Sequence, residues 1–236
     1  FEVDLYQHAN VPVEFTGHPL VDEVVNDKTP AQARELLDLG QQTTVGMFPG
    51  SRKGEVKRLM PIMLKTAKIL QAKNPGIQFV LPLAESLDEA ILDPYLYEIM
   101  DLNINVVRGQ AYDVMQACDA IITASGTATL EIALMGIHMT IIYRVSPISY
   151  NILRFIVKLD YIGLANIVAG KSIVQEFLQG KAKPKLIAAE IQRILNDSDY
   201  NTTIRNELSQ VRNKLGDKSG SVHIAQLAYD MLNNNS

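Results

Sequence analysis

Two turns in the sequence carry the residue types that hold phosphate groups. The first contains Gly50, Ser51 and Arg52 and follows the apolar stretch 44–48, a predicted strand. Glycine lets the backbone approach a phosphate, a serine hydroxyl donates a hydrogen bond, and a guanidinium can bind two phosphate oxygens. The spacing fits neither a Walker A loop nor G-x-G-x-x-G. An ordinary turn with a solvated basic pair would use the same residues, so this turn alone supports both interpretations equally.

The second turn contains Ser125, Gly126 and Thr127, between the predicted strand 120–123 and a predicted helix. Backbone N–H groups at such a helix start have no partner within the helix and can bind an anion. Glu131 follows one helical turn later, where its carboxylate can accept hydrogen bonds from the hydroxyls of a ribose. A plain capped helix also explains this turn. The flanking residues do not fit G-x-S-x-G, which argues against Ser125 as a nucleophile.

A third loop would lie at the same edge of the predicted sheet. It contains Gly109, Gln110 and Tyr112 and follows the predicted strand 104–107. Its backbone could hold a nucleobase, although a simple connection explains it equally well. Two anion-binding turns after neighbouring strands could contact one diphosphate, and this favours a shared nucleotide site over separate turns.

Short apolar segments alternate with longer segments of helical spacing along most of the chain. This alternation predicts an α/β fold, with a doubly wound, Rossmann-like parallel sheet covered by helices on both faces. The predicted strands are Thr44 to Phe48, Gln78 to Leu83, Ile104 to Val107, Ala120 to Thr123 and Met139 to Tyr143. The predicted helices are a long one that ends at Asn74, then Leu87 to Met100, Tyr112 to Ala117, Thr127 to Met135 and Ser149 to Leu159.

The signals for strands stop at Pro184, and a C-terminal helical tail follows. Apolar residues at helical spacing predict a helix after Pro184 and two more near 203–215 and 222–232. We therefore divide the chain into an approach segment at 1–30, an α/β domain at 31–183 and the helical tail at 184–236.

The composition excludes several classes of function. The chain has 236 residues, 47% of them hydrophobic, which suits a packed core. Its formal net charge of -4 gives no general attraction to nucleic acid. The single cysteine, Cys118, and four scattered histidines offer no metal-ligand spacing, so we expect no metal or cofactor. We expect Cys118 to be a small buried side chain.

The segment Ser149 to Leu164 has two interpretations. No apolar run approaches the roughly 20 residues of a membrane-spanning helix. Within the segment, however, Arg154 and Lys158 are spaced four apart beside an apolar helical face, as in helices that lie on a membrane surface. Core packing produces the same pattern, and membrane contact is here the minority interpretation.

Several short motifs, taken in order, resemble one enzyme family. The sequence resembles the lipid-A-disaccharide synthases, which are GT-B glycosyltransferases, from its start to near its end. The motifs that carry the resemblance are Gly17-His18-Pro19-Leu20-Val21-Asp22, Pro49-Gly50-Ser51-Arg52 with Glu55, Ala124 to Glu131, Tyr143-Arg144, and Leu164 to Gly170 followed by Glu176 to Gln179.

The resemblance implies the C-terminal, nucleotide-binding half of a GT-B fold. The implied reaction joins UDP-2,3-diacylglucosamine to 2,3-diacylglucosamine 1-phosphate, giving a β-1,6-linked disaccharide 1-phosphate and UDP without a metal. It implies that Gly50 to Arg52 and Ser125 to Thr127 hold the diphosphate and that Glu131 holds the ribose. By the same resemblance, the Gly109 to Tyr112 loop holds the uracil and Asn166 the donor sugar.

The resemblance also implies a location and partners. It places the family's catalytic base in an N-terminal domain before Phe1, so we expect no catalytic residue in this chain and no transferase activity from it alone. Acylated substrates imply work in the cytoplasm, peripherally on the inner face of the cytoplasmic membrane, and a homodimer is left open. The alternatives are another GT-B enzyme that uses a UDP-sugar, such as a muramyl-pathway transferase or an epimerase, and a non-catalytic nucleotide-binding module.

Overall fold

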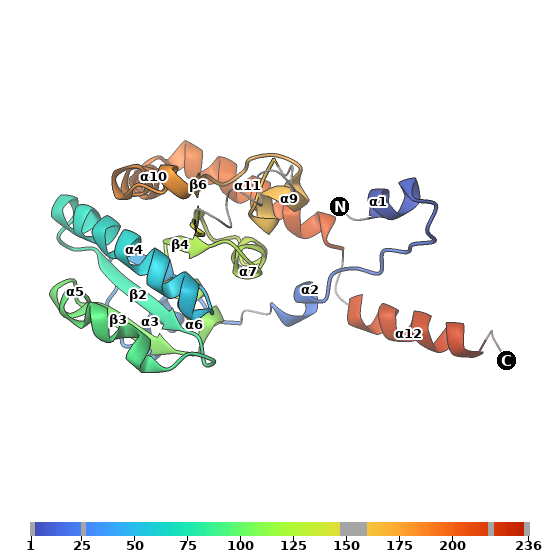
Figure 1. Cartoon of the computed structure of the whole chain (residues 1–236), viewed down its shortest axis with the longest axis horizontal. Helices are drawn as coiled ribbons and strands as arrows, with labels where there is room; N and C mark the ends of the chain where they lie inside the picture. The colour runs from blue at the N-terminus through green and yellow to red at the C-terminus, as the bar shows by residue number, and fades with distance from the viewer. Residues whose placement is uncertain (1–2, 25–26, 147–159, 217–219, 234–236) are drawn as a thin grey trace.

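A sheet of six parallel strands forms the centre of the protein (Figure 1). The structure is a computed structural model that describes residues 3–24, 27–146, 160–216 and 220–233. The strands lie in the order β3-β2-β1-β4-β5-β6, which is the order of the doubly wound dinucleotide-binding fold. They are β1 (Thr44–Phe48), β2 (Gln78–Leu83), β3 (Ile104–Arg108), β4 (Ala120–Ala124), β5 (Met139–Tyr143) and β6 (Glu176–Leu178). The predicted α/β fold class is confirmed.

Helices cover both faces of the sheet, and each face has its own apolar core. One face packs against α4 (Lys53–Lys73), the 3-10 helix η1 (Glu89–Tyr95), α5 (Leu96–Asp101) and α10 (Pro184–Asn196). The other packs against α3 (Pro30–Leu36), α6 (Ala111–Ala117), α7 (Ala128–Leu134), α9 (Leu164–Ala169) and α11 (Ser198–Lys214). The remaining elements are α1 (Val3–His8), α2 (Leu20–Glu23), η2 (Gln179–Lys181) and α12 (Gly220–Asn233).

The single helix predicted over Leu87 to Met100 is wrong. The segment begins with η1, where the Asp88 side chain accepts a hydrogen bond from the Ala90 N–H at 2.9 Å. Pro94 lies inside the segment, has no N–H to donate, and restricts the residue before it. An α-helix therefore forms only from Leu96 onward.

The first two helices of the tail, α10 and α11, pack onto the sheet. Buried Ile187 and Ile191 place α10 in one core, and buried Ile204 and Leu208 place α11 in the other. Helix α12 contacts α2 and lies apart from the sheet (Figure 1). The helix predicted at 149–159, with Arg154 and Lys158, lies outside the described residues. No helix in the described ranges is long and apolar enough to cross a membrane.

The pairing of β1 with β4 brings the two predicted phosphate-binding turns together. Phe48, the last residue of β1, pairs with Thr123 near the end of β4. The strands run parallel, so the chain leaves both at the same edge of the sheet. The strand order reverses between β1 and β4, and in open α/β sheets ligands bind at this point, beyond the carboxyl ends of the strands.

A buried polar network centred on Asn166 supports the second turn. The Asn166 side chain is fully buried, and its Nδ2 donates to the Val174 carbonyl oxygen (2.9 Å) and to Glu176 Oε1 (2.8 Å). Its Oδ1 accepts from the N–H groups of Ile173 (2.9 Å) and Val174 (3.0 Å). The Glu176 carboxylate also accepts from the backbone N–H of Ile162 and of Gly163, each at 3.0 Å. These bonds tie α9 and the chain before it to β6.

This network gives Asn166 a structural role, and its contact with the donor sugar stays a prediction. The amide makes two donated and two accepted hydrogen bonds inside the protein and is shielded from solvent. An asparagine side chain has two N–H donors and an oxygen with two lone pairs, so its capacity is filled. In this structure Asn166 positions the backbone around it.

We predict that Asn166→Ala lowers the free energy of unfolding by about 3 kcal/mol, because it leaves buried N–H groups without acceptors. Urea denaturation would measure the loss. Asn105→Ala is the matched control and should cost about 1 kcal/mol, since the Asn105 amide donates one bond, to the Leu37 carbonyl. Equal losses in the two variants would contradict the structural role of Asn166.

Candidate functional site: a pocket at the carboxyl edge of the sheet

A pocket of about 330 Å³ opens beyond the carboxyl ends of β1, β2, β3 and β4. Most of the site residues predicted from the sequence line it. These are Gly50, Ser51, Arg52, Gly109, Ser125, Gly126, Thr127 and Glu131. Gln110, Tyr112 and Asn166 are not among the lining residues. The structure thus brings four separate segments of the chain to one cavity.

The turn after β1 is shaped by Gly50 and Glu55. Gly50 has a φ of 99°, and a Cβ there would collide with the Glu55 side chain. Glu55 lies in the first turn of α4, and its Oε2 accepts a hydrogen bond from the Arg52 backbone N–H at 3.3 Å. The turn therefore requires glycine for two reasons, the left-handed backbone and the close approach of the carboxylate.

Arg52 is the cation at the mouth of the pocket. Its side chain is 82% exposed, whereas that of Glu55 is 25% exposed, and the two form an ion pair at 3.1 Å through Nη1. One guanidinium nitrogen is thus engaged, and the rest of the guanidinium can still bind an anion. An ion pair with one partner this exposed adds little stability, so Arg52 contributes little to holding the fold.

The turn after β4 is anchored by its hydroxyl groups. The Ser125 hydroxyl donates to the Ile162 carbonyl oxygen at 2.8 Å. The Thr129 hydroxyl donates to the Gly126 carbonyl oxygen at 2.8 Å and accepts from the Leu164 N–H at 3.1 Å. The turn is therefore fixed to the same backbone segment that the Asn166 network holds.

The residues of this turn from Gly126 to Ala128 line the pocket. Within the described chain, the hydrogen bonds of the turn begin with donation from Thr129 to the Gly126 carbonyl and from Leu130 to the Thr127 carbonyl. The N–H groups from Gly126 to Ala128 precede these first bonds and, as at any helix start, have no acceptor within the helix. A Cβ at Gly126 would meet nothing within 4 Å, so the space beside it is open.

Glu131 is half-buried at the side of the pocket and is held by Tyr112. The Tyr112 hydroxyl donates to Glu131 Oε1 at 3.2 Å. Burial raises the pKa of Glu131 above its usual range, and the Tyr112 hydrogen bond opposes this shift. Burial, together with the Glu131 charge, raises the pKa of Tyr112 to about 12. Tyr112 thus belongs to the site as the group that orients the carboxylate.

The loop after β3 has a strained backbone. Gly109 and Gln110 both have positive φ, at 66° and 50°. A side chain at Gly109 would press on Glu85, and Gln110, which is not a glycine, holds the left-handed conformation at the N-cap of α6. Strain of this kind is often found where the backbone is shaped for a ligand. Gln110 is exposed and does not line the pocket.

Sequence reasoning missed the rest of the pocket wall. Pro82, Leu83 and Ala84 line it from the end of β2, and Met115 lines it from α6. These residues are apolar and carry no chemical signature. The only signal that could have found the β2 residues is their place at the end of a parallel strand.

Among the described residues, no group of three or more His, Cys, Asp or Glu could hold a metal ion.

The sequence matches one protein family along nearly its whole length. The profile of the lipid-A-disaccharide synthetase family matches residues 1–229. The lipid-A-disaccharide synthase of Geobacter metallireducens is 47% identical over 233 residues, covering 98% of this chain and 60% of the relative. That of Trichlorobacter lovleyi is also 47% identical, covering 98% and 61%. The chain thus spans about 60% of the length of these curated relatives.

Solved structures of low identity share the fold. A glycosyltransferase from Rickettsia africae matches with a TM-score of 0.59 at 12% identity, covering 92% of this chain and 55% of that one. The C-terminal domain of a glycosyl transferase group 1 family protein from Francisella tularensis matches at 0.57 and 10% identity, covering 84% of this chain and 98% of that domain. The fold is that of the C-terminal half of a GT-B glycosyltransferase, and the chain belongs to the lipid-A-disaccharide synthetase family.

Proposed function

We propose that the carboxyl-edge pocket binds the UDP part of a UDP-sugar donor. The observation that carries the proposal is that turns from β1 and β4, predicted separately as phosphate-binding, line one cavity. A diphosphate between them would meet Ser51 and Arg52 on one side and the amides of Gly126 and Thr127 on the other. Positive charge and N–H donors at this place stabilise a diphosphate leaving group as negative charge builds up on it.

The same pocket has a place for the nucleoside. Glu131 would accept hydrogen bonds from the ribose hydroxyls, with Tyr112 holding its carboxylate in place. The uracil would lie against the Gly109–Gln110 backbone and the apolar wall formed by Leu83, Ala84 and Met115. A volume of about 330 Å³ is at the lower end of small-molecule sites, which suits a nucleotide whose sugar extends beyond the pocket.

For the whole enzyme, we propose the transfer named by its relatives, the synthesis of lipid A disaccharide. The donor would be UDP-2,3-diacylglucosamine and the acceptor 2,3-diacylglucosamine 1-phosphate. In this proposal the chain holds the donor, while the base that takes the acceptor proton belongs to a part of such enzymes that this chain does not span. The relatives are longer than the matched region, which supports this division.

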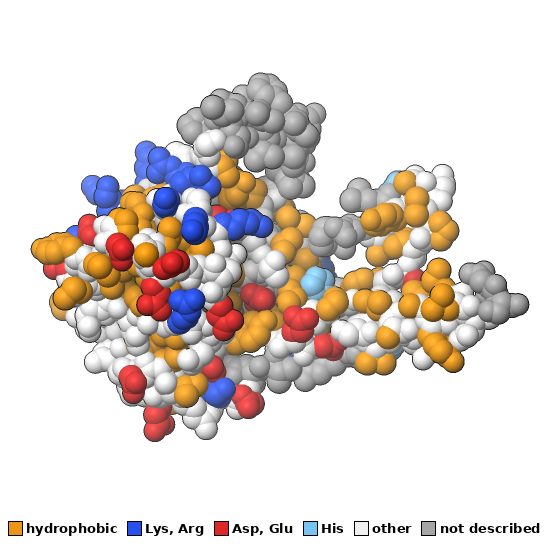
Figure 2. All heavy atoms as spheres, turned by 60° about the horizontal axis from the view of Figure 1, so that its bottom comes forward, with side chains coloured by type: hydrophobic (Ala, Val, Ile, Leu, Met, Phe, Trp, Pro, Cys, Tyr) orange, Lys and Arg blue, Asp and Glu red, His pale blue; other side chains and the backbone are white. Residues whose placement is uncertain are grey.

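We further propose that the enzyme works in the cytoplasm, peripherally on the inner face of the membrane, where acylated substrates are found. Exposed Lys57 and Lys65 of α4 lie on the helix that packs against α10, whose start carries exposed Lys183 and Lys185. Figure 2 shows Lys and Arg side chains gathered on one side of the molecule. Such a side suits anionic lipid headgroups, although the chain as a whole is acidic.

We predict that Arg52→Ala weakens UDP binding about tenfold, because a charge-assisted hydrogen bond to the diphosphate is lost. Isothermal calorimetry would measure the affinity. The free energy of unfolding should change by less than about 0.5 kcal/mol, since the side chain is exposed. Lys57→Ala, an exposed cation of α4 outside the pocket, is the control. Equal UDP affinity in the wild type and the Arg52 variant would remove Arg52 from the site.

We predict that Glu131→Gln weakens UDP binding without lowering the free energy of unfolding. The variant should bind UDP about tenfold more weakly, because a charged acceptor of the ribose hydroxyls becomes neutral. Its free energy of unfolding at neutral pH should equal or exceed that of the wild type, because the variant no longer carries a partly buried charge. Calorimetry and urea denaturation would measure the two quantities.

The pH dependence of stability provides a second readout. The folded protein raises the pKa of Glu131, so protonation favours the fold. The contribution of Glu131 to stability is complete below the ordinary carboxyl pKa and is lost as the pH rises through the raised pKa. The free energy of unfolding of the wild type should therefore rise relative to that of Glu131→Gln as the pH is lowered through that range, so any stability advantage of the variant becomes smaller. Tight UDP binding by the variant would exclude Glu131 as the ribose ligand.

A further inference from the structure

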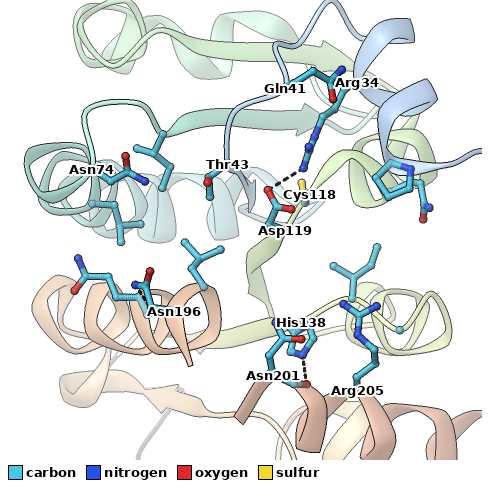
Figure 3. Close-up of a pocket in the computed structure, with 18 of the residues that line it drawn as sticks. Arg34, Gln41, Thr43, Asn74, Cys118, Asp119, His138, Asn196, Asn201 and Arg205 are labelled. Carbon is cyan, nitrogen blue, oxygen red and sulfur yellow. Dashed lines mark hydrogen bonds and ion pairs between the residues drawn. The ribbon is translucent and has the colours of Figure 1, made fainter. Parts of the chain in front are cut away.

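A second, larger cavity of about 700 Å³ opens at the opposite edge of the sheet (Figure 3). One wall is formed by α3, the end of α4 and the start of β1, and the facing wall by the start of β5, α10 and α11. The strands between the two cavities have five or six residues, which is a separation of about 17 Å at 3.3 Å per residue. The two cavities are therefore distinct sites.

Charge and polarity distinguish this cavity. Its charged lining residues are Arg34, Lys73, Asp119 and Arg205. His138 also lines the cavity, and burial lowers the pKa of its imidazole. Three cations thus face one carboxylate in a protein whose formal net charge is -4. Six amide side chains and the Thr43 hydroxyl also line the cavity and suit a polar ligand. The amides are those of Gln41, Asn74, Gln116, Gln192, Asn196 and Asn201.

Arg34 is held rigidly on one wall. Its Nε donates to the Ala117 carbonyl oxygen at 2.9 Å, and its Nη2 pairs with Asp119 Oδ2 at 2.8 Å. The same Asp119 oxygen, Oδ2, also accepts a hydrogen bond from the Thr44 N–H at 2.8 Å. The Arg34 side chain is 11% exposed. It therefore offers its remaining guanidinium N–H groups from a fixed position.

Arg205 enters from the facing wall. Figure 3 shows Arg34 on one wall of the cavity, with its guanidinium on Asp119, and Arg205 on the facing wall. Arg205 makes no ion pair within the described ranges of the chain. Its helix, α11, is fixed close by, because His138 Nε2 bonds the Asn201 carbonyl oxygen at 2.8 Å. An anion between the two guanidinium groups would satisfy both of them.

The other side of the cavity is neutral and hydrogen-bonding. The helices α4 and α10 end there at Asn74 and Asn196, and their last carbonyls carry partial negative charge. Lys73 offsets this charge, and its Nζ donates to Gln192 Oε1 at 2.9 Å. Asn74, Asn196 and Gln192 therefore suit the hydroxyl groups of a ligand better than a second anion.

We propose that this cavity is a binding site for a small hydroxylated phosphate ester of sugar phosphate size. The phosphate lies between Arg34 and Arg205, and the hydroxylated body lies against the amides near Asn74 and Asn196. The ligand spans the two walls and so holds α10 and α11 onto the α3–α4 side of the fold. The proposal is independent of the UDP site, which lies at the other edge of the sheet.

The test is a titration with glucose 6-phosphate, followed by the backbone amide NMR signals of Asn74 and Gly136, which line the cavity. UDP is kept in excess to occupy its own pocket, and the signal of Gly126 reports on that pocket separately. We expect saturable shifts at Asn74 and Gly136 with glucose 6-phosphate and none with glucose. Arg205→Glu should weaken binding at least about tenfold, and Arg205→Ala less. Lys65→Ala, an exposed cation outside the cavity, should bind like the wild type.

Three results would overturn the proposal. They are shifts that do not saturate, equal shifts with glucose, and an unchanged affinity in Arg205→Glu. Because the Arg205 side chain is exposed and its residue lies on an outer helix, folding of the variants can be confirmed from the same spectra. If UDP does not bind, the Gly126 signal stays where it is without UDP, while the signals of Asn74 and Gly136 still report on the second cavity. The two sites are therefore judged separately.

Discussion

The parallel pairing of β1 with β4 is the constraint on which the rest of the molecule depends. It sets Phe48 opposite Thr123 at the point where the strand order reverses. Each turn alone is a short, ordinary connection with a few small or polar residues. Placed next to each other, the two connections form one concave site, with the Arg52 cation on one side and the backbone of Gly126 and Thr127 on the other. The pocket is thus a property of the topology more than of any single motif.

The two turns are held by different means. Gly50 and Glu55 shape the first turn within a single segment of chain. The second depends on distant residues, because Ser125 and Thr129 bond the backbone at 162–164, which Glu176 and Asn166 fix in turn. A buried amide with all its hydrogen bonds made is costly to disturb. Asn166 thus supports the second turn without lining the pocket.

The sequence predicted the framework well and the second layer of contacts poorly. Five strands and the long helix α4 follow from apolar periodicity, and the phosphate turns follow from glycine and hydroxyl residues after strands. The three-residue β6 and the short α9 have too few residues for a periodic signal, and Pro94 divided a helix that periodicity had predicted whole. The roles of Asn166 and Tyr112 depend on partners 7 to 19 residues away, and no local pattern predicts such pairs.

A crystal structure of the protein with UDP is the decisive measurement. We expect diphosphate density between the Gly50–Arg52 turn and the Gly126–Thr127 amides, with the ribose hydroxyls on Glu131 and the uracil against the Gly109–Gln110 backbone. UDP bound elsewhere, or bound with its ribose away from Glu131, would contradict the proposed site.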